Sequence, residues 1–201
     1  YYGVGYRPHT VQRVALGASR DGRLAAIVHD AYQETSSYEE YAEALLDTSR
    51  FLHSCPNVYT RHRIARMNVH TPTYMRAPGE ASGVFALESA MDELAVALNV
   101  DPVELRLRNE PEIDEFKKLP FSSRSTRECY RDAAERFGWS RRDPEPRSMR
   151  DGRWLIGWGM ASATYPMNYA PASAMARLLP DGTAEVTSAA SDMGPGTWTS
   201  M

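Results

Sequence analysis

The clearest hydrophobic pattern in the chain lies between residues 80 and 98. Apolar residues recur there at spacings of three and four, which places them along one side of a helix. The members of this stripe are Val84, Leu87, Met91, Leu94 and Leu98. The charged residues of the same segment mostly fall elsewhere around the helix. The pattern therefore predicts an amphipathic helix that packs its apolar stripe against a core.

Strands are predicted on both sides of two Asp-Gly turns. The first pair of apolar runs, 11–18 and 24–29, flanks Asp21-Gly22, and the second pair, 172–179 and 184–190, flanks Asp181-Gly182. Glycine accepts a positive φ without a steric penalty, so Asp-Gly between two such runs favours a tight hairpin. Two more strands are predicted over 61–70 and 154–164.

Three further helices are predicted from their capping residues. A Ser or Asp followed three residues later by Glu is typical of a helix N-terminus, because the side-chain oxygen accepts a free backbone N–H group. This pattern begins at Ser37, Asp101 and Ser125. It predicts helices over 37–47, 101–109 and 125–138.

The order of these elements indicates the fold class. Strands come first, then helices, then strands again, with hairpins and no repeated βαβ unit, which predicts an α+β fold of mixed or antiparallel hairpins packed with amphipathic helices. Residues 140–153 are charged and contain two prolines, as an exposed linker or surface loop does. We therefore expect a first subdomain over 1–139 and the start of a second over 154–201.

Composition excludes several classes of protein. Of the 201 residues, 42% are hydrophobic and 24% are charged, as in a soluble globular chain, and no apolar run is long enough to span a membrane. A net charge of -3 provides no positive field for nucleic acid. Cys55 and Cys129 are too few for a disulfide framework, and His53 and Cys55 lack the partners of a zinc site. The chain starts at Tyr1 without a targeting signal and stops in a loop, so we expect a piece of a longer polypeptide, either cytoplasmic or periplasmic.

One candidate site lies at 74–80, before the predicted amphipathic helix. The N-terminus of a helix presents unpaired N–H groups and a partial positive charge, which suit an anion or a polarised oxygen. Arg76 adds a permanent charge with forked donors. The alternative is a plain connection from strand to helix in which Arg76 is solvated or paired with a surface acid.

A second candidate site lies at 192–197, after a predicted strand. Its paired glycines, Gly194 and Gly196, let the backbone approach a ligand closely, and exposed amides bind phosphate. The segment lacks the Walker pattern and the third glycine of a dinucleotide fingerprint. The alternative is a simple turn at the end of a strand.

Three long blocks of the sequence resemble consecutive blocks of the molybdenum-binding subunit of the xanthine dehydrogenase and aldehyde oxidase family. They are residues 75–81, 87–95 and 101–109. Shorter matches are Arg7-Pro8, Cys55-Pro56-Asn57, Phe137-Gly138-Trp139, 157–160 and 192–197. The matching blocks extend through the whole chain and occur in the same order as in the family. The chain is therefore interpreted as an internal fragment of such a subunit.

The resemblance implies a molybdenum-dependent oxidoreductase that hydroxylates aldehydes or N-heteroaromatic carbons with oxygen derived from water. The family holds its molybdenum through the dithiolene of a molybdopterin-type cofactor, so no residue of this chain is expected to ligate the metal. Electrons pass to [2Fe–2S] clusters and FAD on partner subunits or domains. Nucleic acid is not an expected partner, and no membrane span is expected.

The resemblance also implies roles for particular residues. Arg76 lies beside the molybdenum centre, where its guanidinium polarises an oxo group or a substrate oxygen. The backbone of the 76–79 loop faces the same site, and the later glycine loop contacts the pterin or its phosphate. The implied cofactor-binding residues are Ala77, Gly79, Gly194, Gly196 and Thr197.

Two departures from the family pattern shape the prediction. Pro195 stands where many relatives have Gln, which removes an N–H group and a side-chain amide. The catalytic glutamate of the family and its glycine-rich upstream pterin loop lie outside these 201 residues, so we expect this segment alone neither to bind cofactor tightly nor to turn over substrate. The alternative is a cofactor-free scaffold or subunit-interaction domain of a degenerate relative, with Pro195 as its main support.

Overall fold

The computed structural model describes residues 5–164, 170–192 and 194–201, and it divides into two compact units, Tyr1–Tyr165 and Pro166–Met201. We describe each unit by itself. The α+β class with mixed and antiparallel strand pairs, predicted from the sequence, is confirmed. Met193, in the second candidate loop, lies outside the described residues.

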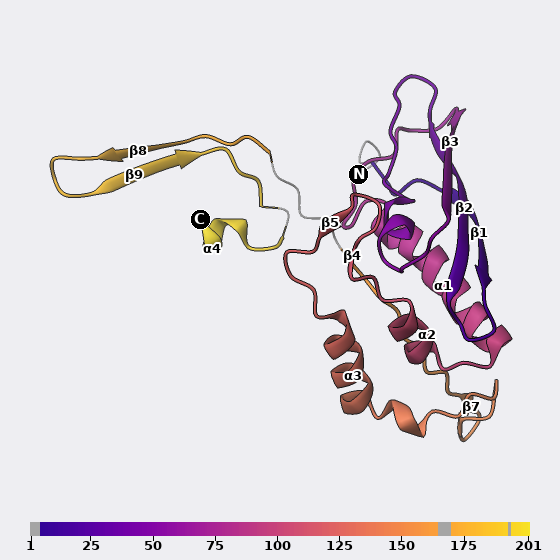
Figure 1. Ribbon diagram of the computed structural model, residues 1–201. Coiled ribbons are helices and arrows are strands. Elements are labelled where there is room, and N and C mark those ends of the chain that lie inside the picture. The colour runs from indigo at the N-terminus through magenta and orange to yellow at the C-terminus, as the bar shows by residue number, and fades with distance from the viewer. Residues whose placement is uncertain (1–4, 165–169, 193) are drawn as a thin grey trace. The chain divides into compact units, whose positions relative to one another are not determined.

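The first unit is built on a three-stranded sheet of order β1-β2-β3 (Figure 1). β1 (Thr10–Ala18) and β2 (Leu24–Ser36) form the predicted antiparallel hairpin, with Gly22 at a φ of 86° in the turn. β3 (Val58–Met67) confirms the third strand, slightly earlier in the chain than predicted, and pairs parallel to β2. β2 continues beyond the predicted end because both of its edges are paired.

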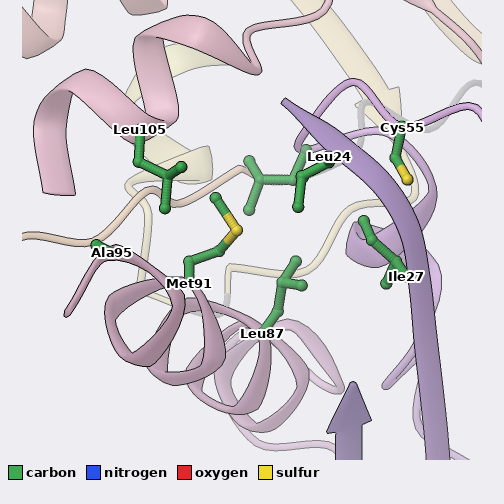
Figure 2. Packing of buried hydrophobic residues seen from close by; sticks show 8 residues of the cluster. Leu24, Ile27, Cys55, Leu87, Met91, Ala95 and Leu105 are labelled. Carbon is green, nitrogen blue, oxygen red and sulfur yellow. The ribbon is translucent and has the colours of Figure 1, made fainter. Parts of the chain in front are cut away.

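The predicted amphipathic helix is α1 (Glu80–Leu98), which lies along one face of the sheet (Figure 1). Leu87 and Met91 of its apolar stripe are fully buried against Leu24 and Ile27 of β2 (Figure 2). Leu105 of α2 closes the same core. The stripe therefore does what its spacing predicts, and burial of these side chains is the main favourable contribution to the stability of this unit.

Two more helices follow α1. α2 (Pro102–Arg108) begins as predicted, because Asp101 Oδ1 accepts the N–H of Val103 at 2.8 Å and that of Glu104 at 3.2 Å. α3 (Thr126–Phe137) confirms the last of the predicted helices, but Ser125 makes no capping hydrogen bond, so the capping box expected there is wrong.

The helix predicted over 37–47 is wrong. Most of that segment has no regular structure, and a single 3-10 turn, η1 (Asp47–Arg50), follows it. Three side chains of β2 accept its amide hydrogens at 2.9 Å each: Ser36 from Glu39, Thr35 from Tyr41, and Gln33 from Glu43. These N–H groups are bound across to the sheet and are not available for a helical turn.

The strand predicted over 154–164 is also wrong for most of its length. Of the predicted strand, only β7 (Trp154–Leu155) is a β-strand in the structure. It pairs with β6 (Arg150–Asp151), which lies inside the predicted loop. The other small elements of this unit are β4 (Ile113–Asp114), β5 (Leu119–Pro120) and the 3-10 turn η2 (Trp139–Arg141). Among the described residues no strand pairs with 156–164, and a strand without a partner leaves its backbone groups unsatisfied.

The second unit contains the other predicted hairpin. β8 (Ala174–Leu178) pairs antiparallel with β9 (Ala184–Ser188), and Gly182 has a φ of 85° in the turn. The short helix α4 (Thr197–Ser200) follows. In the described ranges of both units, none of the helices combines the length and apolar character needed to cross a membrane.

His29 of β2 is a buried imidazole that is bonded to two neutral side chains. Its Nδ1 lies 2.8 Å from Ser49 Oγ, and its Nε2 lies 2.9 Å from Gln12 Oε1. The amide nitrogen of Gln12 donates to Thr10 and Ser82, so the Gln12 oxygen is the acceptor and the proton of His29 lies on Nε2. Burial lowers the pKa of His29 to about 4.

The free energy of unfolding is therefore expected to decrease as pH falls through the window between the two pKa values of His29. The unfolded chain binds a proton near the ordinary pKa of about 6.5, while the folded chain binds it only near a pKa of about 4. A His29→Gln variant is expected to lose less unfolding free energy over the same fall in pH, because it lacks the titrating imidazole. Urea midpoints of both proteins at about pH 7 and about pH 4.5 measure the difference. Equal losses in both proteins would contradict the assignment.

Candidate functional site

Residues 76–79 form a tight loop that leads into α1. Ala77 has a φ of 55°, in the left-handed region that a residue with a Cβ atom rarely adopts, and Gly79 has a φ of 95°. A Cβ atom at Gly79 would lie 2.5 Å from backbone atoms of Ala44, so this position needs glycine both for its conformation and for its close packing. A left-handed alanine persists only where the surrounding structure imposes it.

Two charged side chains impose this conformation. Arg7 Nη2 donates to the carbonyl oxygen of Arg76 at 2.6 Å, and Arg7 Nη1 donates to that of Ala77 at 3.3 Å. Arg7 Nη1 also lies 3.5 Å from Glu43 Oε2, and the same carboxylate oxygen accepts the N–H of Gly79 at 3.0 Å. The side chain of Glu43 is completely buried. The cation of Arg7 therefore binds carbonyl oxygens of the loop, and the anion of Glu43 binds one of its N–H groups.

The side chain of Arg76 is exposed. Among the described residues it makes no ion pair and no side-chain hydrogen bond, so of the two forms of the alternative the surface acid is absent there, and an exposed side chain is equally what a solvated Arg76 would show. The side chain of Tyr74, just before it, packs edge-on against Tyr41, with ring centroids 5.0 Å apart. The loop thus presents a free guanidinium next to a fixed backbone.

Two polar groups within four residues of Arg76 in the sequence also lack partners within the described part of the chain. No acceptor there binds the N–H of Ala77. Glu80, the first residue of α1, is buried, and its Oε2 has no hydrogen-bond partner. A buried polar atom without a partner, such as Glu80 Oε2, is uncommon in proteins and is satisfied by water or by a ligand.

The first turns of α1 pack closely on the segment around residue 45. A Cβ atom at Gly83 would lie only 1.8 Å from the carbonyl oxygen of Leu45. Glycines at positions 79 and 83 therefore let the start of α1 approach the 43–45 backbone, and this approach brings Glu43 within reach of the loop.

The second candidate loop lies in the second unit. Gly194 and Gly196 have φ values of 106° and 89°, and Thr197 begins α4. Asp192 Oδ1 accepts the N–H of Gly194 at 2.8 Å and that of Gly196 at 3.3 Å. The N–H of Gly194 is the main cause that lowers the pKa of the Asp192 carboxyl. The amides predicted to contact a pterin thus converge on an anion here, and that anion is the carboxylate of Asp192.

A buried ion cluster, not foreseen from the sequence, lies between α1, α2 and two loops. Glu88 Oε2 accepts from Arg106 Nε at 2.7 Å and from the N–H of Ser162 at 2.7 Å, and Glu88 Oε1 lies 2.6 Å from His53 Nε2. Tyr130 of α3 is hydrogen-bonded to the Ser162 hydroxyl. Burial by itself raises the pKa of the Glu88 carboxyl, but His53, Arg106 and Ser162 together hold it below its usual value.

This ion cluster is structural in character. Arg106 is fully buried, and its Nη1 also donates to the carbonyl oxygen of Pro102 at 3.0 Å. Arg106 Nη2 also lies 2.9 Å from Asp92 Oδ1, so the cluster joins residues of α1, α2, α3 and two loops, and its buried arginine is paired within the protein. In the ranges that the structure describes, no group of three or more His, Cys, Asp or Glu side chains is arranged to hold a metal ion.

Comparisons with known proteins bear on both loops. The sequence pattern of the molybdopterin cofactor-binding domain matches residues 3–110, and a second pattern of the same description matches residues 132–201. The first match contains the 76–79 loop, and the second contains the 194–197 loop.

Individual relatives agree with these patterns. The chain is 36% identical to the aldehyde oxidoreductase molybdenum-binding subunit PaoC of Escherichia coli O157:H7, over 96% of this chain and 26% of that protein. It is 31% identical to the putative xanthine dehydrogenase molybdenum-binding subunit XdhA of Escherichia coli K12, over 90% of this chain and 26% of that protein. In fold it resembles the aldehyde oxidoreductase of Desulfovibrio gigas, with a TM-score of 0.60 at 24% identity, over 90% of this chain and 21% of that one.

These relatives are molybdenum-dependent oxidoreductases or their subunits, and the chain spans about a quarter of the length of the curated ones. The resemblance inferred from the three sequence blocks is confirmed. With one cofactor-binding pattern matching more than half of its residues and a second covering most of the rest, this chain belongs to the molybdopterin cofactor-binding family that includes the molybdenum-binding subunits of aldehyde oxidoreductase and xanthine dehydrogenase.

Proposed function

We propose that this chain is part of a molybdenum hydroxylase subunit and contributes the 76–79 loop to its active site. The observation that carries the proposal is the exposed guanidinium of Arg76, which has no partner in the described ranges, on a loop of constrained backbone at the start of α1. A preorganised cation costs no reorganisation when negative charge develops on a reacting oxygen. Arg76 is accordingly the proposed catalytic residue.

The residues of the first loop fit a hydrogen-bonding heterocyclic cofactor. The loop offers a cation at Arg76, together with a donor at the N–H of Ala77 and a buried acceptor at Glu80 Oε2 that have no partners in the part of the chain that the structure describes. Ala77 would contact the cofactor through this N–H group. The N–H of Gly79 is already bound to Glu43, so Gly79 would contribute by shaping the loop.

The second loop would bind the pterin or its phosphate. Its amides at Gly194 and Gly196 already hold an anionic oxygen, that of Asp192, which is the chemistry that a phosphate needs. Thr197 would add a hydroxyl. In this proposal residues 1–139 and 154–201 belong to two cofactor-binding subdomains, and residues 140–153 connect them.

The bound cofactor would supply a two-electron oxidation in which water provides the oxygen. Aldehydes are the proposed substrates, since the aldehyde oxidoreductase subunit PaoC is more similar to this chain than the xanthine dehydrogenase subunit XdhA is. N-heteroaromatic compounds are the alternative class. The electrons would pass to iron–sulfur and FAD partners. Arg76 would bind and polarise the substrate oxygen, and the rest of the loop would hold Arg76 in place.

One specific observation favours a second function, that of a cofactor-free scaffold. Pro195 cannot donate a hydrogen bond, and Asp192 already occupies the amides on either side of it. Metal analysis of the purified intact protein discriminates between the two functions. The hydroxylase proposal expects about one molybdenum per subunit and oxidation of aromatic or aliphatic aldehydes. Protein that contains no molybdenum and oxidises neither aldehydes nor N-heteroaromatic compounds would support the scaffold.

A further inference from the structure

We propose that Arg7 and Glu43 are positioning residues of this site, an inference that rests on the proposed function of Arg76 and extends it. Neither residue lies near Arg76 in sequence, yet both bind its loop directly. Arg7 holds two successive carbonyl oxygens, those of Arg76 and Ala77, and Glu43 holds the N–H of Gly79. We refer to these two side chains as the loop clamp.

The loop clamp determines the direction of the peptide group between Arg76 and Ala77. The described peptide bonds are all trans, so the N–H of a peptide group points opposite to its carbonyl oxygen. Because Arg7 holds the carbonyl oxygen of Arg76, the N–H of Ala77 points away from Arg7. This N–H has no acceptor among the described residues.

The loop clamp also maintains the left-handed conformation of Ala77. An alanine in this region is disfavoured by about 1 kcal/mol relative to its ordinary conformations. Two charge-assisted hydrogen bonds from one guanidinium offset this cost. Relaxation of Ala77 would rotate the adjoining peptide groups and would move Arg76 together with them.

Glu43 depends on Arg7 in turn. The carboxylate of Glu43 is fully buried, and a buried charge is strongly unfavourable without a partner. Arg7 supplies that partner at 3.5 Å, and the N–H of Gly79 supplies a hydrogen bond at 3.0 Å. The backbone N–H of Glu43 is bound to Gln33 of β2, so the clamp is anchored to the sheet.

The loop clamp can be tested independently of catalysis, by hydrogen exchange of the 75–80 segment in the intact protein. The variants are Arg7→Met and Glu43→Gln. The matched control is Arg13→Met, which removes an exposed arginine of β1 that binds no side chain in the described structure. We expect exchange at the amide of Gly79 to become about tenfold faster or more in both clamp variants and to stay unchanged in the control.

Chemical rescue separates positioning from general damage to the fold. The side chain of Arg7 is 29% exposed, so an Arg7→Gly variant would leave a space that is open to solvent. Guanidinium ion at tens of millimolar is expected to restore most of the lost exchange protection, while ethylammonium at the same concentration is not, because only the guanidinium fork can bind two carbonyl oxygens.

The turnover of the same variants provides a second measurement. A positioning role predicts that kcat falls about tenfold in Arg7→Met, while the KM for an aldehyde changes little. Unchanged Gly79 exchange in Arg7→Met would overturn the clamp. Faster Gly79 exchange together with full activity of an Arg76→Met variant would instead retain the clamp and overturn the proposed function.

Discussion

Replacement of Arg76 by Met in the intact, molybdenum-loaded protein is expected to lower kcat by about 100-fold to 1000-fold. The loss of one preorganised donor to a developing oxyanion has effects of this size in other enzymes. Met keeps an unbranched, mainly aliphatic stem and removes the charge and the forked donors. Since the side chain of Arg76 is exposed and binds no described side chain, the fold is expected to be unaffected. Steady-state oxidation of an aldehyde, at matched molybdenum content, measures the change.

Two controls make this result specific to Arg76. Arg76→Lys keeps the charge without the fork and is expected to retain part of the activity. Arg13→Met removes an exposed arginine that lies outside the loop and is expected to leave kcat unchanged. If Arg76→Met has the kcat of the unaltered protein at equal molybdenum content, the catalytic proposal is wrong.

Glu88→Ala is expected to destabilise the first unit by about 3 kcal/mol, the low end of the cost of breaking a buried ion pair, because Asp92 Oδ1 still lies 2.9 Å from Arg106 Nη2. Arg106 is fully buried and would lose its contact to Glu88 Oε2 at 2.7 Å. The N–H of Ser162 would lose its acceptor as well. Hydrogen exchange of the α1 amides in the intact protein reports the free energy of opening and measures this loss.

A double variant distinguishes an uncompensated charge from simple loss of packing. When Arg106→Met is added to a Glu88→Leu change, apolar side chains replace both ions, and we expect most of the stability to return. Glu93→Ala, which removes an exposed carboxylate of the same helix, is expected to change the free energy of opening by about 0.5 kcal/mol or less. A Glu88→Ala protein as stable as the Glu93→Ala control would show that the ion cluster is not needed.

The elements predicted correctly are those in which a local pattern and the tertiary packing agree. The apolar stripe of α1 repeats with the helical period and faces the core that it indicates. Asp101 caps α2, and Asp-Gly turns join both long hairpins. Each of these signals lies within a few residues of the structure that it predicts.

The elements predicted wrongly are those in which a distant partner decides the outcome. The capping pattern at Ser37 has the residues of a helix start, but side chains of β2 bind the amides of that segment. The apolar run after Trp154 has strand composition, but the described structure supplies a partner for only its first two residues. Propensity is a weak signal, and tertiary hydrogen bonds override it.

The sequence by itself was enough to predict the apolar stripe of α1 and the family, which the structure and the comparisons confirm, because periodicities and motif residues are local properties of the chain. It also identified Arg76 and the glycines of both loops as candidate site residues, and their roles stay predictions. Only the tertiary structure decided that Arg7 and Glu43 hold the Arg76 loop, that Glu88 and Arg106 form a buried pair, and that β3 lies parallel to β2. Those contacts join residues that are far apart in the chain. A charged residue has the same identity whether it is solvated or buried, and the packing of the folded chain determines which of the two occurs.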